Sequence, residues 1–313
     1  MALVGTAVRP DFRRALTIIE VLVALFFLGL VAVFVALPAM ARPRCCGGRQ
    51  MKDGTQVRNV IQAMTIFAQG NRDTYPLPSQ LDVNNQTVAL GTPGDASTQR
   101  GKDTLNHILS ILVFNSSISP ELLYCPSEVN AAIKVDTDYQ NSDPKTAVVP
   151  ANAVWDPALR CDFTAGEGNI SYAALMPNGD PSGKPGTSQG RLPRWSNTFN
   201  ATEAVFGNRG PLVTGRDAKG NVLYNTKSLT MLIHGGRTTW EGNIGYNDNH
   251  VNFETRMDPT EITYNVALGN GKTKVKEDIF FYDEPDDADG LNAYLGVWIQ
   301  AGNKPGEFKG IHD

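Results

Sequence analysis

Four side chains in the carboxy-terminal half have the residue types of a metal or acid-base site: His234, Glu241, Asp248 and His250. Imidazole and carboxylate groups bind metal ions and transfer protons. No two histidines are four residues apart, which is the spacing that places two ligands on one face of a helix. The His-Gly-Gly sequence at His234 is equally typical of a turn. We therefore interpret this segment as a structural hairpin and expect no catalytic residues.

An acidic segment near the carboxy terminus is a second candidate site. Clustered carboxylates on a loop can hold Ca²⁺, which takes about six to eight oxygen ligands. The spacing does not match the helix-loop-helix calcium motif, so we favour a solvated loop, with calcium as the alternative and no other cofactor expected. The carboxylates concerned are Asp283, Asp286, Asp287 and Asp289.

A long apolar run near the amino terminus contains one acidic residue. No residue from Val21 to Ala41 is charged, and about 20 helical residues cover the roughly 30 Å hydrocarbon core of a bilayer. Glu20 lies at the amino end of the run, and a carboxylate at mid-bilayer costs roughly 2.5 to 3.5 kcal/mol. We therefore predict a transmembrane helix over residues 16–41 and a specific role for Glu20.

The residues that lead into this run are two arginines, a small residue and then Leu-Thr-Ile-Ile-Glu, from Arg13 to Glu20. This order resembles the processing segment of type IV prepilins and type II secretion pseudopilins. In that family a peptidase cuts after a small residue and methylates the new terminal amine. The resemblance implies a leader over residues 1–15, cleavage between Ala15 and Leu16, and Glu20 as the fifth mature residue. Alanine and leucine at the cut replace the family's commoner glycine and phenylalanine.

The same resemblance gives Glu20 a partner. Cleavage would expose an amine at Leu16, which Glu20 of a neighbouring subunit could neutralise in a low-dielectric bundle of helices. Only a staggered neighbour presents the complementary charge. The pair would therefore set the order in which subunits assemble.

An apolar stripe at helical spacing follows the run. Pro43 and Gly47-Gly48 interrupt helix propensity between the two. We assign residues 42–70 to a linker and the amphipathic half of a spine helix, whose first half is the transmembrane helix. The stripe consists of Val57, Val60, Ile61, Met64, Phe67 and Ala68.

Residues 71–313 are predicted to form a globular α+β body of short apolar segments, turns and loops. Residues 244–246 and 251–253 alternate in polarity around Asn247-Asp248-Asn249, which predicts a hairpin. The Gly-, Pro- and Ser-rich residues 177–195 predict a flexible loop. The predicted fold class is α+β, with a long amino-terminal spine helix, transmembrane in its first half and amphipathic in its second, packed on an antiparallel β-sheet body with long loops.

The four cysteines fall into two pairs. Cys45 and Cys46 are adjacent and are expected to be unpaired thiols. Cys125, in a Cys-Pro-Ser segment, and Cys161, before a Ser-Tyr segment, match motifs that recur in large pseudopilin-like proteins. If the body lies outside the cytoplasm, a Cys125–Cys161 disulfide is expected, and two buried free thiols are the alternative. Because no Cys-x-x-Cys spacing occurs, a four-cysteine zinc site is not expected.

The formal net charge of -4 gives no basic surface for nucleic acid, so none is expected as a partner. The resemblance implies a single-pass inner-membrane protein with a cytoplasmic amino terminus and a body that is periplasmic, or extracellular after assembly. Its partners would be prepilin peptidase, membrane lipid and other pilin or pseudopilin subunits, in a homo- or hetero-polymer.

The expected function is therefore a structural subunit of a filament, in a type II secretion or related system, and not an enzyme. A membrane-anchored binding module, with residues 177–195 as a recognition loop, is one alternative. An anchored metal-dependent hydrolase that uses His234, Asp248 or His250 is the other.

Overall fold

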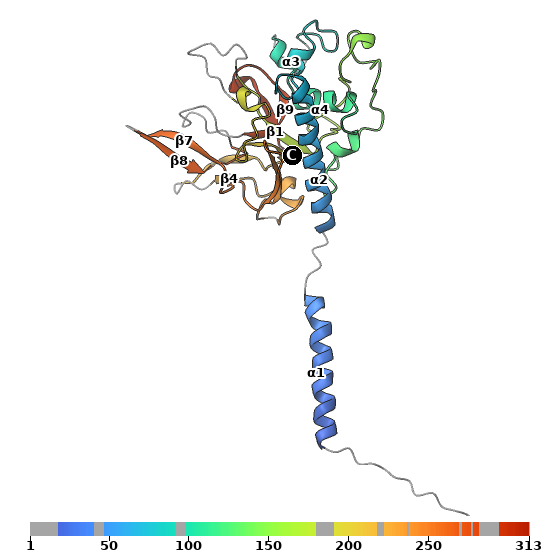
Figure 1. Ribbon diagram of the computed structural model, residues 1–313, viewed down its shortest axis with the longest axis vertical. Coiled ribbons are helices and arrows are strands. Elements are labelled where there is room, and N and C mark those ends of the chain that lie inside the picture. The colour runs from blue at the N-terminus through green and yellow to red at the C-terminus, as the bar shows by residue number, and fades with distance from the viewer. Residues whose placement is uncertain are drawn as a thin grey trace, which may run out of the picture. The chain divides into compact units, whose positions relative to one another are not determined.

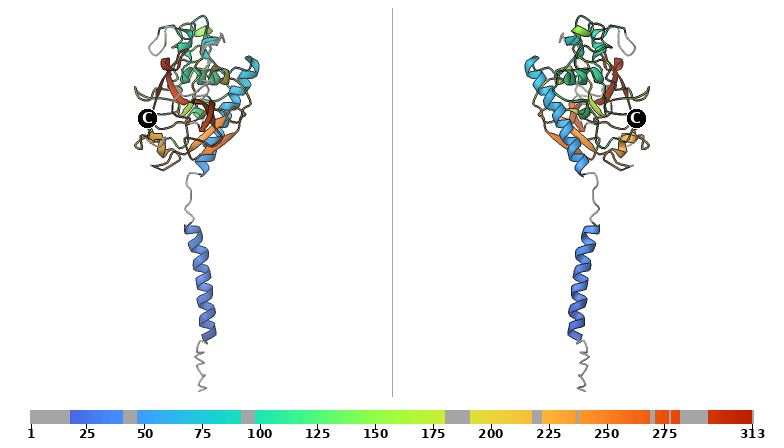
Figure 2. Two further views of the ribbon diagram at one scale, coloured as in Figure 1. Left: turned by 90° about the vertical axis from the view of Figure 1, so that its left-hand side faces the viewer. Right: turned by 90° about the vertical axis from the view of Figure 1, so that its right-hand side faces the viewer.

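The computed structural model divides into two compact units, Met1–Cys45 and Cys46–Asp313. Figure 1 draws both, and Figure 2 gives two further views. The structure describes residues 18–40, 47–91, 98–179, 191–217, 222–236, 238–268, 271–276, 278–281 and 294–312.

The first unit contains helix α1 (Ile18–Met40). Its described large apolar side chains are solvent-exposed within the unit, including Ile18, Phe26 and Leu28 at 80%, 67% and 69%. Glu20 lies in the first turn of the helix.

The prediction of a transmembrane helix over residues 16–41 is wrong. A helical span needs about 20 consecutive apolar residues. Within the described part of the chain, no helix combines the required length with the required apolar character. The predicted inner-membrane, single-pass location is corrected by the same finding.

The predicted long spine helix is also wrong, and with it the fold class as stated. Helix α1, which ends at Met40, and helix α2 (Gly47–Gly70) belong to different units. Helix α2 carries charged residues, including Arg49, Lys52 and Arg58. The described residues therefore hold no long apolar helix that could serve as a spine.

Helix α2 packs against a six-stranded antiparallel sheet, with strand order β10-β9-β1-β2-β5-β6. Figure 2 shows the helix crossing the strands of the β5–β6 end obliquely. Its buried face carries the predicted stripe, of which Val57, Val60, Ile61, Met64 and Ala68 are fully buried. The strands are β1 (Tyr172–Leu175), β2 (Ala204–Asn208), β5 (Gly242–Tyr246), β6 (Val251–Glu254), β9 (Leu295–Gln300) and β10 (Lys309–Ile311).

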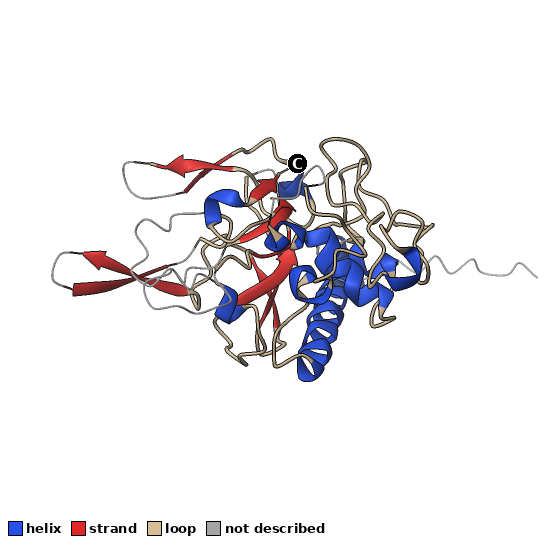
Figure 3. Ribbon diagram, turned by 90° about the horizontal axis from the view of Figure 1, so that it is seen from above, coloured by secondary structure: helices blue, strands red, loops and turns tan. Residues whose placement is uncertain are grey.

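The predicted hairpin is confirmed in β5 and β6, which pair antiparallel from Gly242 opposite Glu254 to Gly245 opposite Val251. Asn249 in the connecting turn has a φ of 71°, a left-handed conformation that asparagine tolerates. Two further hairpins, β3–β4 and β7–β8, extend from the side of the sheet away from the helices (Figure 3). They consist of Val213–Arg216 with Val222–Tyr224, and Thr263–Leu268 with Gly271–Lys276.

Short helices complete the second unit. Helix α4 (Leu105–Phe114) is buried on most of its surface and lies against α2 and β9. The remaining short helices are α3 (Pro78–Leu81), η1 (Gln99–Lys102), η2 (Pro120–Leu123), η3 (Pro150–Asn152), η4 (Leu192–Arg194), η5 (Leu229–Leu232) and η7 (Pro305–Glu307).

Close contact between α2 and β5 depends on a glycine. A Cβ at Gly245 would lie 2.0 Å from Ile61 Cδ1 and 3.0 Å from Val57 Cγ1, both on the buried face of α2. Any larger residue there would push the helix from the sheet or force its core side chains out of their rotamers.

Replacing this glycine should therefore destabilise the body. We expect Gly245→Ala to lower the free energy of unfolding by about 1–3 kcal/mol, the usual cost of overpacking a core. Urea denaturation would measure it. Gly166→Ala is the matched control, since a Cβ there meets no atom within 4 Å. Equal stability of the two variants would show that α2 is not held this closely on the sheet.

Candidate functional site

Several predicted site residues have no described side chain. The processing residues Ala15 and Leu16 and the calcium candidates Asp283, Asp286, Asp287 and Asp289 lie outside the described residues, as do residues 180–190 of the predicted loop at 177–195. The backbone of Glu20 is helical, and its side chain is not described.

The predicted Cys125–Cys161 disulfide is replaced by two buried free thiols. The two sulfurs have separate hydrogen-bond partners. Cys161 Sγ donates to Asn106 Oδ1 at 3.3 Å, whereas Cys125 Sγ accepts from the backbone N–H of Ser127 at 3.4 Å. Burial raises the pKa of Cys161 to about 12, so this thiol stays protonated at neutral pH.

The histidines of the predicted hairpin segment are divided between two places. His250 bonds to Asp248 across the β5–β6 turn and stacks on Tyr246, with ring centroids 4.3 Å apart. His234 instead bonds to Asp53, a residue of α2. The residue types noted in the sequence therefore do not form one site.

A buried cluster of Asp53, Cys125 and His234 is the strongest candidate site. The three residues come from α2, from the segment after η2 and from the segment after η5, and their potential ligand atoms all lie within 4.8 Å of one another. The side chains of Asp53 and His234 are 0% and 1% exposed, and Cys125 is fully buried. Three distant parts of the chain thus meet at one polar point in the core.

The Asp53 carboxylate is the centre of this cluster. Tyr172 of β1 donates its hydroxyl to Oδ1 at 2.7 Å. Asn243 of β5 donates its amide to Oδ2 at 2.6 Å, and His234 Nε2 lies 2.9 Å from the same oxygen. Each donor comes from a different element, so the carboxylate joins α2 to the sheet and to the segment after η5.

These hydrogen bonds decide the charge state of Asp53. Burial alone would raise the pKa of this carboxyl, but the hydrogen bonds from His234, Tyr172 and Asn243 outweigh burial, and the net pKa is lowered. Burial, and next the nearby Asp53 charge, raise the pKa of Cys125. Because a neutral thiol is a poor nucleophile, the cluster is not arranged for covalent catalysis.

The imidazole of His234 has one nitrogen without a partner. Within the described residues, Nδ1 is buried and makes no hydrogen bond. A proton on Nδ1 would be an unsatisfied buried donor, which costs about 1–3 kcal/mol. This geometry favours a proton on Nε2, donated to Asp53.

Sequence reasoning missed Asp53, although a signal was present. Asp53 precedes Val57 by four residues and so lies in register with the apolar stripe of α2. A carboxylate on the buried face of an amphipathic helix requires polar partners in the core.

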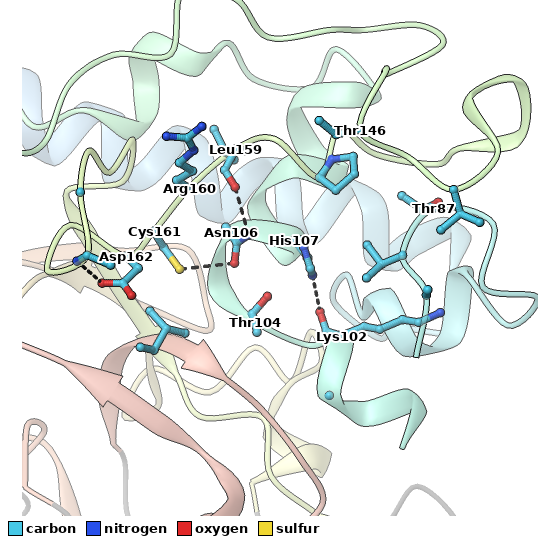
Figure 4. Close-up of a pocket in the computed structure, with 18 of the residues that line it drawn as sticks. Thr87, Lys102, Thr104, Asn106, His107, Thr146, Leu159, Arg160, Cys161 and Asp162 are labelled. Carbon is cyan, nitrogen blue, oxygen red and sulfur yellow. Dashed lines mark hydrogen bonds between the residues drawn. The ribbon is translucent and has the colours of Figure 1, made fainter. Parts of the chain in front are cut away.

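A separate cavity of about 690 Å³ lies beside α4 (Figure 4). Its wall includes Asn106, His107 and Cys161, and each of them makes at least one hydrogen bond to the protein. Asn106 Nδ2 donates to Leu159 O at 3.0 Å, and His107 Nδ1 lies 2.9 Å from Lys102 O. This cavity presents no activated nucleophile or ionised acid-base pair in these three residues.

Comparison with protein-family models, curated proteins and solved structures finds no match to this chain.

The partly buried His107 predicts a specific acid sensitivity. Burial lowers the pKa of His107 from 6.5 to about 4. Between these values the unfolded chain binds a proton that the folded chain does not. The free energy of unfolding should thus fall by roughly 3 kcal/mol as the pH drops from 6.5 to 4, with no contribution above 6.5.

The variant His107→Asn isolates this contribution, because the asparagine amide can still donate to the Lys102 carbonyl. We expect the difference in the free energy of unfolding between wild type and variant to shrink as the pH falls from 6.5 to 4. Urea titrations at several pH values would measure it. A difference independent of pH would contradict the buried, neutral state of this histidine.

Proposed function

We propose that this chain is a structural subunit of a filament, cut by prepilin peptidase between Ala15 and Leu16 and assembled through its amino-terminal helix. A type II secretion or related system is the proposed setting, and other pilin-like subunits are the proposed partners. The observation that carries the proposal is the position of Glu20, the fifth residue after the small residue of the Arg13–Glu20 segment.

The exposed apolar side chains of α1 support this proposal. Ile18, Phe26 and Leu28 are among many large apolar residues that the helix leaves uncovered within its own unit. Contiguous exposed apolar surface marks a site of interaction. Helices of neighbouring subunits would supply that cover.

Glu20 would then fix how the helices align. Two unit charges about 4 Å apart attract by about 4 kcal/mol at an effective dielectric of about 20. Desolvation of both charges offsets much of this gain, so the pair contributes more to register than to stability. A subunit without the carboxylate would leave its neighbour's amine unpaired in an apolar bundle.

The body supports a structural role over the hydrolase alternative. His234 is bonded to Asp53, while Asp248 and His250 are bonded to each other on the β5–β6 turn. Each of the three residues that the hydrolase alternative could use therefore already has a bonded partner in the body.

Two measurements test this proposal: the mass of the mature chain, and the amount of it that assembles into filaments. After co-expression with prepilin peptidase, we expect a chain that begins with N-methylated Leu16. We expect Glu20→Ala to be processed normally but to enter filaments at least about tenfold less, a loss of roughly 1.4 kcal/mol or more. Mass spectrometry and quantification of sheared filaments would measure the two effects.

Glu167→Ala is the matched control, because it removes a half-exposed carboxylate of the body. It should leave both processing and assembly unchanged. A chain that retains Met1, or Glu20→Ala subunits that assemble as well as the control, would contradict the proposal.

A further inference from the structure

We propose that Asp53, Cys125 and His234 bind a divalent transition-metal ion of the zinc class. Carboxylate oxygen, thiolate sulfur and imidazole nitrogen are the three donor types that zinc takes in proteins. Their potential ligand atoms lie within 4.8 Å of one another in a buried place. A mixed nitrogen and sulfur donor set excludes calcium and magnesium, which prefer oxygen.

The surroundings of the cluster hold two of the three ligands, Asp53 and Cys125, by hydrogen bonds of the kind that orient metal ligands. Tyr172 and Asn243 donate to the two carboxylate oxygens of Asp53. Cys125 Sγ accepts the backbone N–H of Ser127 and, at 3.9 Å, the side-chain amide of Asn208. N–H donors to sulfur stabilise the negative charge of a thiolate.

Charge balance in the core also favours an ion. The Asp53 carboxylate is buried beside His234, Tyr172 and Asn243, and burying a charge is costly even where hydrogen bonds offset part of the cost. A divalent ion with one carboxylate and one thiolate is neutral. Metal binding would therefore remove the net charge from the core.

Binding needs one proton to leave and one to move. The S–H bond of Cys125 breaks, its proton passes to water, and the sulfur binds the ion as a thiolate. The imidazole proton of His234 moves from Nε2 to Nδ1, where a water molecule would have to accept it, because Nδ1 has no partner within the described residues. Nε2 and Asp53 Oδ2 then bind the ion, no electron is transferred, and one proton is released per ion.

A cavity next to the cluster gives the ion a route. This cavity of about 500 Å³ is lined in part by Gly54, Asn243 and Phe253. Asn243 contacts Asp53, and the Phe253 ring lies 5.7 Å from the His234 ring. Rotation of the Asn243 side chain would open the cluster to the cavity, from which water could supply a fourth ligand.

The test is titration of the full chain with Co²⁺, which reports thiolate ligation by a near-ultraviolet charge-transfer band. Every chain in this titration carries Cys45→Ser and Cys46→Ser, because the two adjacent cysteines would add a band of their own. We expect one Co²⁺ per chain, one proton released per ion, and competition by Zn²⁺. Cys125→Ser should abolish the band and weaken binding about a hundredfold or more.

Cys161→Ser is the matched control, because it removes the other buried thiol and should keep the band. Absence of the band, or a band that survives Cys125→Ser in a chain with a native near-ultraviolet circular dichroism spectrum, would overturn the proposal. If Cys125→Ser does not fold, X-ray absorption by the zinc-loaded chain, with Cys125 in place, tests whether a sulfur atom binds the ion. One sulfur neighbour at about 2.3 Å is expected, and none or two would overturn the assignment.

Discussion

Helix α2 is held on the sheet by one buried carboxylate, Asp53, whose two oxygens receive hydrogen bonds from β1, from β5 and from the segment after η5. An isolated carboxylate in the core would be strongly unfavourable, so each of these donors is required by the burial of the acid. Elements far apart in the sequence are thus constrained to meet at a single point, and the positions of Cys125 and His234 follow from it.

The apolar contacts around this point act together with it. Gln56, one turn along α2, donates its amide to the backbone oxygens of Glu121 and Tyr124, and so holds the segment that carries Cys125. On the same helix, Val57 and Ile61 pack over Gly245. The polar and apolar contacts of α2 therefore select the same register of the helix on the sheet, which is the local and global agreement expected of a well-specified fold.

The sequence was informative where one local pattern determined the result. The stripe from Val57 to Ala68 has helical spacing and is the buried face of α2, and the alternation around Asn247-Asp248-Asn249 is the β5–β6 hairpin. Both the helix and the hairpin depend on residues close in sequence, and the periodicity of those residues indicates which face is buried.

Predictions that depended on long-range placement fared worse. The two cysteines at 125 and 161 could bond only if the fold brought their sulfurs together, and they are free thiols with separate partners. The predicted spine required a long apolar helix followed by an amphipathic one to act together, and α1 and α2 lie in different units. The Asp53 cluster joins residues 181 positions apart, so no local pattern could reveal all of it.

The central claim is that Asp53 couples α2 to the sheet, and a double-mutant cycle between Asp53→Ala and Tyr172→Phe tests it most directly. Each free energy of unfolding would be obtained by urea denaturation. The account predicts that the two losses are non-additive, with a coupling energy of about 1–3 kcal/mol. Losses that add to within about 0.5 kcal/mol would show that the carboxylate and the strand are energetically independent, and would contradict the account.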